Sequence, residues 1–144
     1  MSSDRNLYIL CGGQSSRMGK NKALLQPDGK TMLNRLIQRA QPYFNEIVLL
    51  SGQNNYPYGL RQLPDAIENS GPLAGLIAAM KDSHSGFLAL LPVDLPLISD
   101  KTLQLLSVHN PVQKDICIAK SDERIQPLAG IYRKESEPEL DVYL

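Results

Sequence analysis

The apolar residues of this chain occur in two patterns, continuous runs and a spacing of three and four, which alternate from segment to segment. Short continuous apolar runs that stop at Gly, Ser or Pro are typical of buried strands in a parallel sheet, because both faces of such a sheet are covered. Segments in which apolar residues recur at spacings of three and four predict helices with one apolar face. The predicted strands are 7–11, 47–50, a short strand over 60–63, 87–91, 116–119 and 131–132.

Three predicted helices lie between these strands. Thr31 is a suitable N-cap for the first, Gly71-Pro72 opens the second, and Ser99 or Asp100 caps the third. Residues 52–60 are rich in Asn, Gly, Tyr and Pro and predict a loop. The residues that form the three apolar faces are Leu33, Leu36, Ile37 and Ala40; Leu73, Leu76, Ile77 and Met80; and Leu103, Leu105 and Leu106.

Strands that alternate with helices predict an α/β fold with a parallel or mostly parallel sheet. A length of 144 residues fits one domain over residues 1–144. In such sheets the ligand lies beyond the carboxyl ends of the strands, near the point where the strand order reverses. The segments that follow predicted strands, and so are candidates for a site, are 12–22, 51–53, 65–71 and 92–96.

The composition argues against several classes of protein. The chain has 15 basic and 15 acidic residues and is 42% hydrophobic, unlike a disordered chain of high net charge. It lacks the basic excess of proteins that bind nucleic acid or a membrane surface. No apolar run reaches the length of a transmembrane helix, and no signal peptide is expected. Cys11 and Cys117 lie in apolar runs and predict reduced, buried thiols in a cytoplasmic protein.

The first chemistry-bearing segment combines glycines with cations. Gly12 and Gly13 follow a predicted strand and can present bare N–H groups, which form anion-binding concavities. Arg17, Lys20 and Lys22 place three cations within six residues, a combination suited to a polyphosphate. The spacing fits neither a P-loop, a dinucleotide fingerprint nor a nucleophile elbow. The alternative interpretation is a solvated basic loop between a strand and a helix.

Two further segments suggest nucleotide chemistry. Asp94 follows a buried strand between two prolines, and one such carboxylate with phosphate oxygens is a common Mg²⁺ site. Asp65 has a similar position in Leu63-Pro64-Asp65. Gly71 at a helix start leaves N–H groups free for an anion. The alternatives are turn or cap roles for the aspartates and close helix packing for the glycine.

Taken together, these segments resemble the molybdenum cofactor guanylyltransferase family. Residues 10–25 read L-C-G-G-Q-S-S-R-M-G-K-N-K-A-L-L and resemble the family's L-A-G-G-x-S-x-R-M-G-x-D-K-x-L-L. Residues 71–75 match its G-P-L-A-G, residues 92–96 resemble its P-C-D-x-P, and residues 126–132 resemble its H-P-L-x-A-L-Y. The resemblance implies a three-layer αβα, Rossmann-like nucleotidyltransferase with a glycosyltransferase-A-like fold.

The resemblance also implies a reaction, in which the terminal phosphate of molybdopterin attacks the α-phosphorus of GTP and pyrophosphate leaves. Mg²⁺ is the implied cofactor, with Asp94 as its ligand, and Arg17 and Lys22 neutralise the triphosphate. Ser51 stands where the family has a base-contacting Asn. Partners beyond GTP and the molybdenum cofactor would be other cofactor-synthesis proteins or molybdoenzyme chaperones. The residues implied in nucleotide binding are Leu10, Cys11, Gly12, Gly13, Lys22, Ser51, Asp65, Gly71 and Asp94.

The chain departs from the family pattern at several positions. Cys11 replaces Ala, Asn21 replaces Asp, Ser51 replaces Asn and Val93 replaces Cys. The family's later N-x-N-T-P-x-D-like segment, associated with the pterin side, does not occur in these 144 residues. We therefore expect the chain to bind GTP–Mg²⁺ and to transfer poorly. The alternatives are a cytidylyltransferase for the same cofactor or for a sugar or alcohol phosphate, and a non-catalytic nucleotide-binding module.

Overall fold

The structure is a computed structural model of the 144-residue chain. It describes residues 4–11, 31–52, 56–64, 72–93, 98–111, 114, 116–121 and 124–138. Its elements in chain order are β1 (Asn6–Leu10), α1 (Met32–Ala40), β2 (Glu46–Leu50), β3 (Gln62–Leu63), α2 (Pro72–Asp82), β4 (Phe87–Pro92), α3 (Asp100–Val108), β5 (Ile116–Ser121), β6 (Arg124–Arg133) and the 3₁₀ helix η4 (Lys134–Ser136).

One six-stranded sheet organises these elements, in the order β3-β2-β1-β4-β6-β5. The pairs β3–β2, β2–β1 and β1–β4 are parallel, whereas β6 is antiparallel to both of its neighbours, β4 and β5. The chain moves outward from β1 to β3 and then crosses to the other side of β1 to form β4. This arrangement confirms the predicted α/β fold with a mostly parallel sheet.

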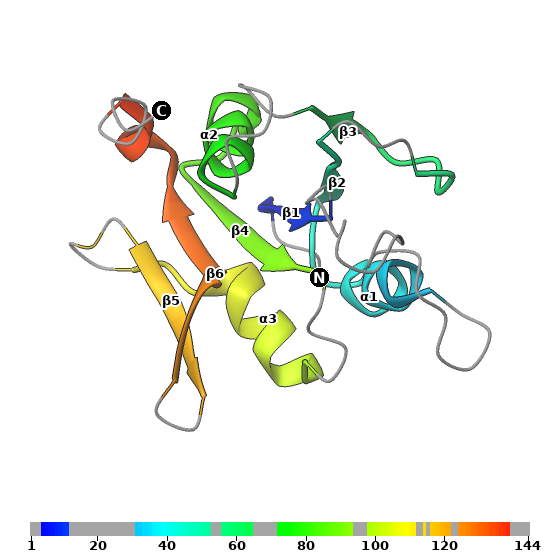
Figure 1. The fold of residues 1–144 in the computed structure, drawn as a ribbon. Coiled ribbons are helices and arrows are strands. Elements are labelled where there is room, and N and C mark those ends of the chain that lie inside the picture. The colour runs from blue at the N-terminus through cyan, green and yellow to red at the C-terminus, as the bar shows by residue number, and fades with distance from the viewer. Residues whose placement is uncertain are drawn as a thin grey trace.

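Helices cover both faces of the sheet, which confirms the three predicted layers. In the view of Figure 1, α2 lies above the sheet and α1 and α3 lie below it. The alternate residues of β1 follow this division, because side chains along a strand point to opposite faces. Leu7 and Ile9 pack with the apolar faces of α1 and α3, whereas Tyr8 packs with Leu76 and Met80 of α2.

The helix starts show why two of the caps could be predicted. The hydroxyl of Thr31 accepts a hydrogen bond from the N–H of Asn34 (3.0 Å), and that of Ser99 accepts one from Thr102 (3.1 Å). Both bonds satisfy an N–H that a helix start leaves without a partner in the helix. Ser99, rather than Asp100, is thus the cap of α3. Leu105, predicted on the apolar face of α3, is 53% exposed instead.

Strand β6 is longer than its predicted two residues and runs over Arg124–Arg133. Its register with β5 changes between the pairs Ile118–Gly130 and Ala119–Gln126, so Pro127, Leu128 and Ala129 form a bulge. A proline has no N–H for a sheet hydrogen bond, and its presence at a bulge fits this rule. The same proline and glycine interrupt the apolar run, which is why only 131–132 was predicted as strand.

Gly130 is expected to tolerate no side chain, because it lies between two backbones. A Cβ atom there would stand 2.5 Å from the carbonyl oxygen of Cys117 and 3.0 Å from the Cα of Ile118. Since backbone atoms cannot move aside cheaply, we expect Gly130→Ala to lower the free energy of unfolding by roughly 1–3 kcal/mol. Urea denaturation measures this loss. Gly86→Ala is the control, because a Cβ there meets nothing within 4 Å; equal losses in both variants would contradict the prediction.

Candidate functional site

The strand order reverses at β1, which lies between β2 and β4. The carboxyl ends of these strands lie level with one another, since Leu10 pairs with both Leu50 and Pro92. The next residues extend the alignment. The N–H of Cys11 donates to Leu50 O (3.2 Å), and the N–H of Val93 donates to Leu10 O (3.1 Å). The chain therefore leaves β1, β2 and β4 at one edge of the sheet, where ligands of such folds bind.

Strand β3 ends at the same edge. Leu50 pairs with Leu63, and the N–H of Ser51 donates to Leu63 O (3.0 Å). Three of the predicted site residues, Leu10, Cys11 and Ser51, are thus brought together at the ends of the adjacent strands β1 and β2. The other predicted site residues lie outside the described residues; they are Gly12, Gly13, Arg17, Lys22, Asp65, Gly71 and Asp94.

Three of the remaining predicted site residues directly follow a described residue of this edge in the chain. Gly12 follows Cys11 directly, Asp65 follows Pro64, and Asp94 follows Val93. The three described neighbours all stand where a strand of the parallel sheet ends. Two of the four predicted segments, those after β1 and β4, therefore continue from adjacent strands at the point of reversal.

Leu10 and Ser51 have different surroundings at this edge. Leu10 is partly buried and packs against the cluster beneath α2. Ser51 is 4% exposed, and its hydroxyl donates to Leu63 O over 3.4 Å. The hydroxyl oxygen can therefore still accept a hydrogen bond from a ligand. A contact between Ser51 and a nucleotide base stays a prediction.

Cys11 is a structural thiol. Its side chain is 4% exposed, and its thiol donates to Leu50 O at 3.6 Å. Burial raises the pKa of the Cys11 thiol to about 12, with a smaller opposing effect from the Tyr56 hydroxyl. The other cysteine, Cys117, was predicted to be buried as well and is only partly so. The reason is that it lies on β5, an edge strand.

The two thiols are expected to react at different rates with a disulfide reagent such as DTNB. With a pKa of about 12, roughly one Cys11 thiol in ten thousand is ionised at pH 8, and the thiolate is the nucleophile. We expect one fast thiol, which Cys117→Ser removes, and a second that reacts fully only after unfolding. Absorbance without denaturant measures the fast thiol, and absorbance after unfolding in denaturant measures both. Retention of the fast thiol in Cys117→Ser would contradict the assignment.

Charged side chains of the described residues gather at the opposite, amino edge of the sheet. Arg61 contacts Glu46 (2.8 Å) and Asp82 (2.7 Å), and Tyr8 donates to Asp82 (2.8 Å). Hydrogen bonds from Arg61 lower the pKa of both carboxylates, while burial raises the pKa of Tyr8. Because the four groups partner one another, the cluster ties β1, β2 and α2 together.

A second contact at the amino edge involves Arg5. Its guanidinium donates to the carbonyls of Leu106 and His109, each at 2.8 Å, at the end of α3. A cation is favourable there, because the carbonyls at a helix carboxyl end lack partners in the helix. Arg5 therefore fixes α3 to the start of β1.

The described side chains at the carboxyl ends of β1, β2, β3 and β4, by contrast, are neutral. They belong to Leu10, Cys11, Ser51, Leu63, Pro64 and Val93. Within the described residues no group of three His, Cys, Asp or Glu side chains could hold a metal ion. Mg²⁺ bound with a nucleotide needs only one or two carboxylates besides phosphate oxygens. The donor set fits Mg²⁺ if a carboxylate comes from a residue that continues from this edge, and Asp65 and Asp94 are the two that directly follow it.

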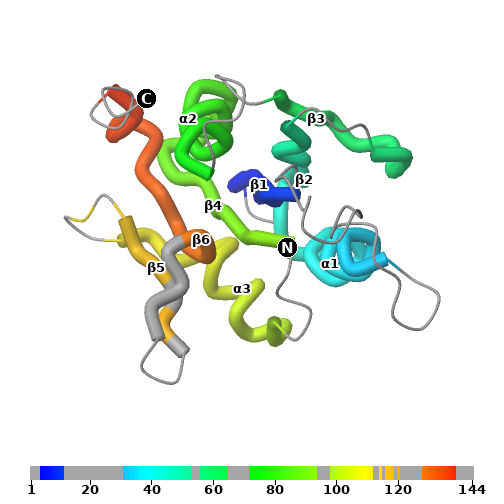
Figure 2. The backbone as a smooth tube through the Cα atoms, in the orientation of Figure 1, coloured from blue at the N-terminus to red at the C-terminus, as the bar shows by residue number. Residues whose placement is uncertain are grey.

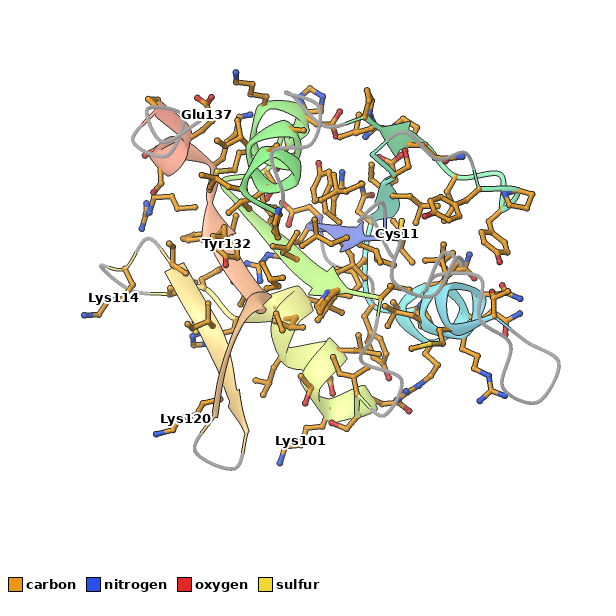
Figure 3. All side chains as sticks on the ribbon, viewed as in Figure 1. Cys11, Lys101, Lys114, Lys120, Tyr132 and Glu137 are labelled. Atoms are coloured by element: carbon orange, nitrogen blue, oxygen red, sulfur yellow. The ribbon has the colours of Figure 1, made fainter. Side chains whose placement is uncertain are left out.

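Sequence reasoning missed two tyrosines that reach this edge. Residues 52–60 were predicted only as a loop, yet the Tyr56 hydroxyl donates to Cys11 O, and the Tyr58 hydroxyl lies 2.7 Å from Thr31 Oγ1. Figure 3 labels Cys11 at the end of β1, beside β2. The available signal was the presence of two aromatic residues in an otherwise polar loop.

An open, mostly parallel α/β sheet with a site at its point of strand reversal defines a class of nucleotide-binding α/β proteins. The chain belongs to the MobA-like NTP transferase family, whose model matches residues 7–144, and it is a nucleotidyltransferase. This match confirms the resemblance seen in the sequence motifs. Among the described residues, no helix has the length and apolar character that a membrane span requires.

Two curated relatives illustrate the similarity. A probable molybdenum cofactor guanylyltransferase of Flavobacterium johnsoniae is 35% identical over 132 residues, which cover 91% of this chain and 70% of that protein. A molybdenum cofactor guanylyltransferase of Shewanella sp. (strain MR-4) is 31% identical over an alignment that covers 100% of this chain and 76% of that protein.

Solved structures share the fold. A protein of Aquifex aeolicus superposes with a TM-score of 0.79 at 25% identity, over 99% of this chain and 76% of that one. Molybdopterin-guanine dinucleotide biosynthesis protein A of Archaeoglobus fulgidus superposes with a TM-score of 0.75 at 21% identity, over 95% of this chain and 71% of that one. Both confirm the α/β fold.

Proposed function

We propose that this chain transfers GMP from GTP to the terminal phosphate of the molybdenum cofactor, with release of pyrophosphate and with Mg²⁺ as cofactor. The observation that carries the proposal is the level carboxyl edge of β1, β2 and β4, where Gly12 follows Cys11 and Asp94 follows Val93 in the chain. The names of the two relatives supply the acceptor. The same proposal treats residues 1–144 as one domain acting in the cytoplasm.

In this function, different residues would bind the phosphates and the metal ion. Main-chain N–H groups of Gly12 and Gly13 bind phosphate oxygens, and Arg17 and Lys22 neutralise the charge of the triphosphate. Asp94 holds Mg²⁺, which when bound withdraws electron density from phosphate oxygens. Nucleotidyl transfer depends on positioning of the two reactants and on cations that stabilise the phosphate charge, and it needs no covalent nucleophile from the protein.

The remaining residues of the proposed site face the nucleoside. Leu10 and Ser51 contact the base or ribose, and Asp65 accepts hydrogen bonds from the nucleotide. Gly71 offers a free N–H at the start of α2. Cys11 contributes its main chain, because its side chain is buried among apolar groups.

Nucleotide binding is the primary test. Isothermal titration with GTP, CTP, ATP and UTP, each with and without Mg²⁺, is expected to give the tightest binding for GTP with Mg²⁺. Binding is measured first and turnover second, because the non-catalytic alternative differs from the proposal only in turnover. A preference for CTP would support the cytidylyltransferase alternative. GTP binding without pyrophosphate release would support the non-catalytic alternative, and absence of nucleotide binding would overturn the proposal.

A further inference from the structure

We propose that Tyr56 and Tyr58 are positioning residues that fix the two ends of the nucleotide-binding segment 12–30, and so set the affinity for the triphosphate. The inference rests on the proposed function, since it assigns these tyrosines a role in the same site. It begins from two hydrogen bonds that join one loop to Cys11 and to Thr31, the described residues on either side of that segment.

Tyr56 holds the first end. Its side chain is 2% exposed, and its hydroxyl donates to the carbonyl oxygen of Cys11. The N–H of Cys11 is already bonded to Leu50 O at 3.2 Å. The main chain of Cys11 is therefore held from both sides, by β2 and by the tyrosine, at the last described residue before Gly12.

Gln62 holds Tyr56 in turn. The Gln62 side-chain oxygen accepts from the N–H of Tyr56 (2.9 Å), and its amide nitrogen donates to Tyr56 O (2.8 Å). Gln62 belongs to β3 and pairs with Leu49 of β2. The tyrosine is thus attached to the sheet by two hydrogen bonds from one amide, which leaves its main chain little freedom to shift.

Tyr58 holds the second end. Its hydroxyl lies 2.7 Å from Thr31 Oγ1, the same oxygen that caps α1 by accepting from Asn34 N–H at 3.0 Å. Figure 2 shows that the stretch leading into β3 lies on the same side of the molecule as α1. The start of α1, which follows the segment, is therefore tied to the loop that also holds Cys11.

Fixing both ends affects binding through entropy. A chain segment whose flanking residues are held has fewer accessible conformations, so less conformational entropy is lost on binding and the affinity is higher. We therefore expect loss of one tyrosine hydrogen bond to weaken nucleotide binding by roughly 3- to 10-fold. The effect concerns the phosphates, because the residues proposed to bind them, Gly12, Gly13, Arg17 and Lys22, lie in this segment.

The test compares Tyr56→Phe and Tyr58→Phe with a matched control, Tyr8→Phe. All three changes remove one hydroxyl, but Tyr8 lies on the other face of the sheet, where it donates to Asp82 (2.8 Å). Titrations measure the dissociation constants of GTP and GMP for each variant, well below its unfolding temperature. Amide hydrogen exchange measures protection of the Cys11 N–H.

We expect Tyr56→Phe to weaken GTP binding by roughly 3- to 10-fold, to weaken GMP binding less, and to speed exchange at Cys11. Tyr58→Phe should also weaken GTP binding more than GMP binding, but by a smaller factor. Tyr58 is less buried than Tyr56, and loss of its hydroxyl leaves the N-cap hydrogen bond of Thr31 intact. Tyr8→Phe should bind both nucleotides like the original chain.

Lys22→Ala separates the two proposals. If the original chain binds GTP and Lys22→Ala weakens it, while both loop variants keep the original GTP affinity, the tyrosine inference is overturned and the proposed function stands. Equal losses for GTP and GMP, or the same loss in Tyr8→Phe, would show a general stability effect and would also overturn the inference. If the original chain binds no nucleotide, both proposals fall.

Discussion

Asp94→Asn is expected to abolish the Mg²⁺-dependent gain in GTP affinity and to lower GMP transfer by about 100-fold or more. Asn keeps the shape of the side chain but removes the negative charge that a hard cation needs. A bound metal stabilises transition-state charge by several kcal/mol, and each 1.36 kcal/mol is about tenfold in rate. Mg²⁺ titration at fixed GTP, followed by pyrophosphate release, measures both effects.

Asp4→Asn is the matched control for this change. Asp4 is exposed and precedes β1, so it lies at the amino edge, opposite to the proposed site. Asp4→Asn removes the same charge from the chain as Asp94→Asn and should leave the Mg²⁺ dependence of GTP binding unchanged. If Asp94 only forms a turn, Asp94→Asn will shift stability slightly and behave like the control in the titration.

The parallel part of the fold could be predicted because burial on both faces leaves a simple signal. Strands such as β1 and β4 are continuous apolar runs with stops at their ends, and each helix has an apolar face. β6 has neither property. It is antiparallel to both neighbours and carries a bulge at Pro127, so its sequence is interrupted by residues that normally end a strand.

The candidate site could be predicted from local sequence to the extent that its residues follow strands. Leu10 ends β1, Cys11 follows it and Ser51 follows β2, and the structure brings the three together through strand register. The contacts of Tyr56 could not be predicted in this way. Its hydroxyl donates to a main-chain carbonyl 45 residues earlier in the chain, and a carbonyl carries no signature in the sequence.

The amino-edge contacts were missed for a related reason. Arg61 and Asp82 are separated by 21 residues and meet only because α2 returns the chain to the start of β4. Tyr8 was part of an apolar run and gave no sign that its hydroxyl would reach Asp82. Tertiary contacts of this kind depend on the order of the strands, which hydrophobic periodicity does not determine.

Lys22→Ala is expected to weaken GTP binding by about 10- to 150-fold. A charge-assisted hydrogen bond between an ammonium and a phosphate contributes roughly 1.5–3 kcal/mol, and each 1.4 kcal/mol is tenfold in affinity. Removal of the charge leaves the phosphate without that contact, whereas a lysine outside a packed core contributes little to folding. The unfolding temperature should therefore barely change, and GTP titration should report almost the whole effect.

Lys120→Ala controls for the loss of one positive charge. Lys120 is exposed on the edge strand β5, and β4 and β6 separate that strand from β1, where Figure 3 labels Cys11. If GTP affinity depended on net charge alone, both variants would weaken binding equally at low salt. A specific phosphate contact predicts a large loss for Lys22→Ala only. Unchanged affinity in Lys22→Ala would return residues 12–22 to the interpretation of a solvated basic loop, and would remove the main cation from the proposed mechanism.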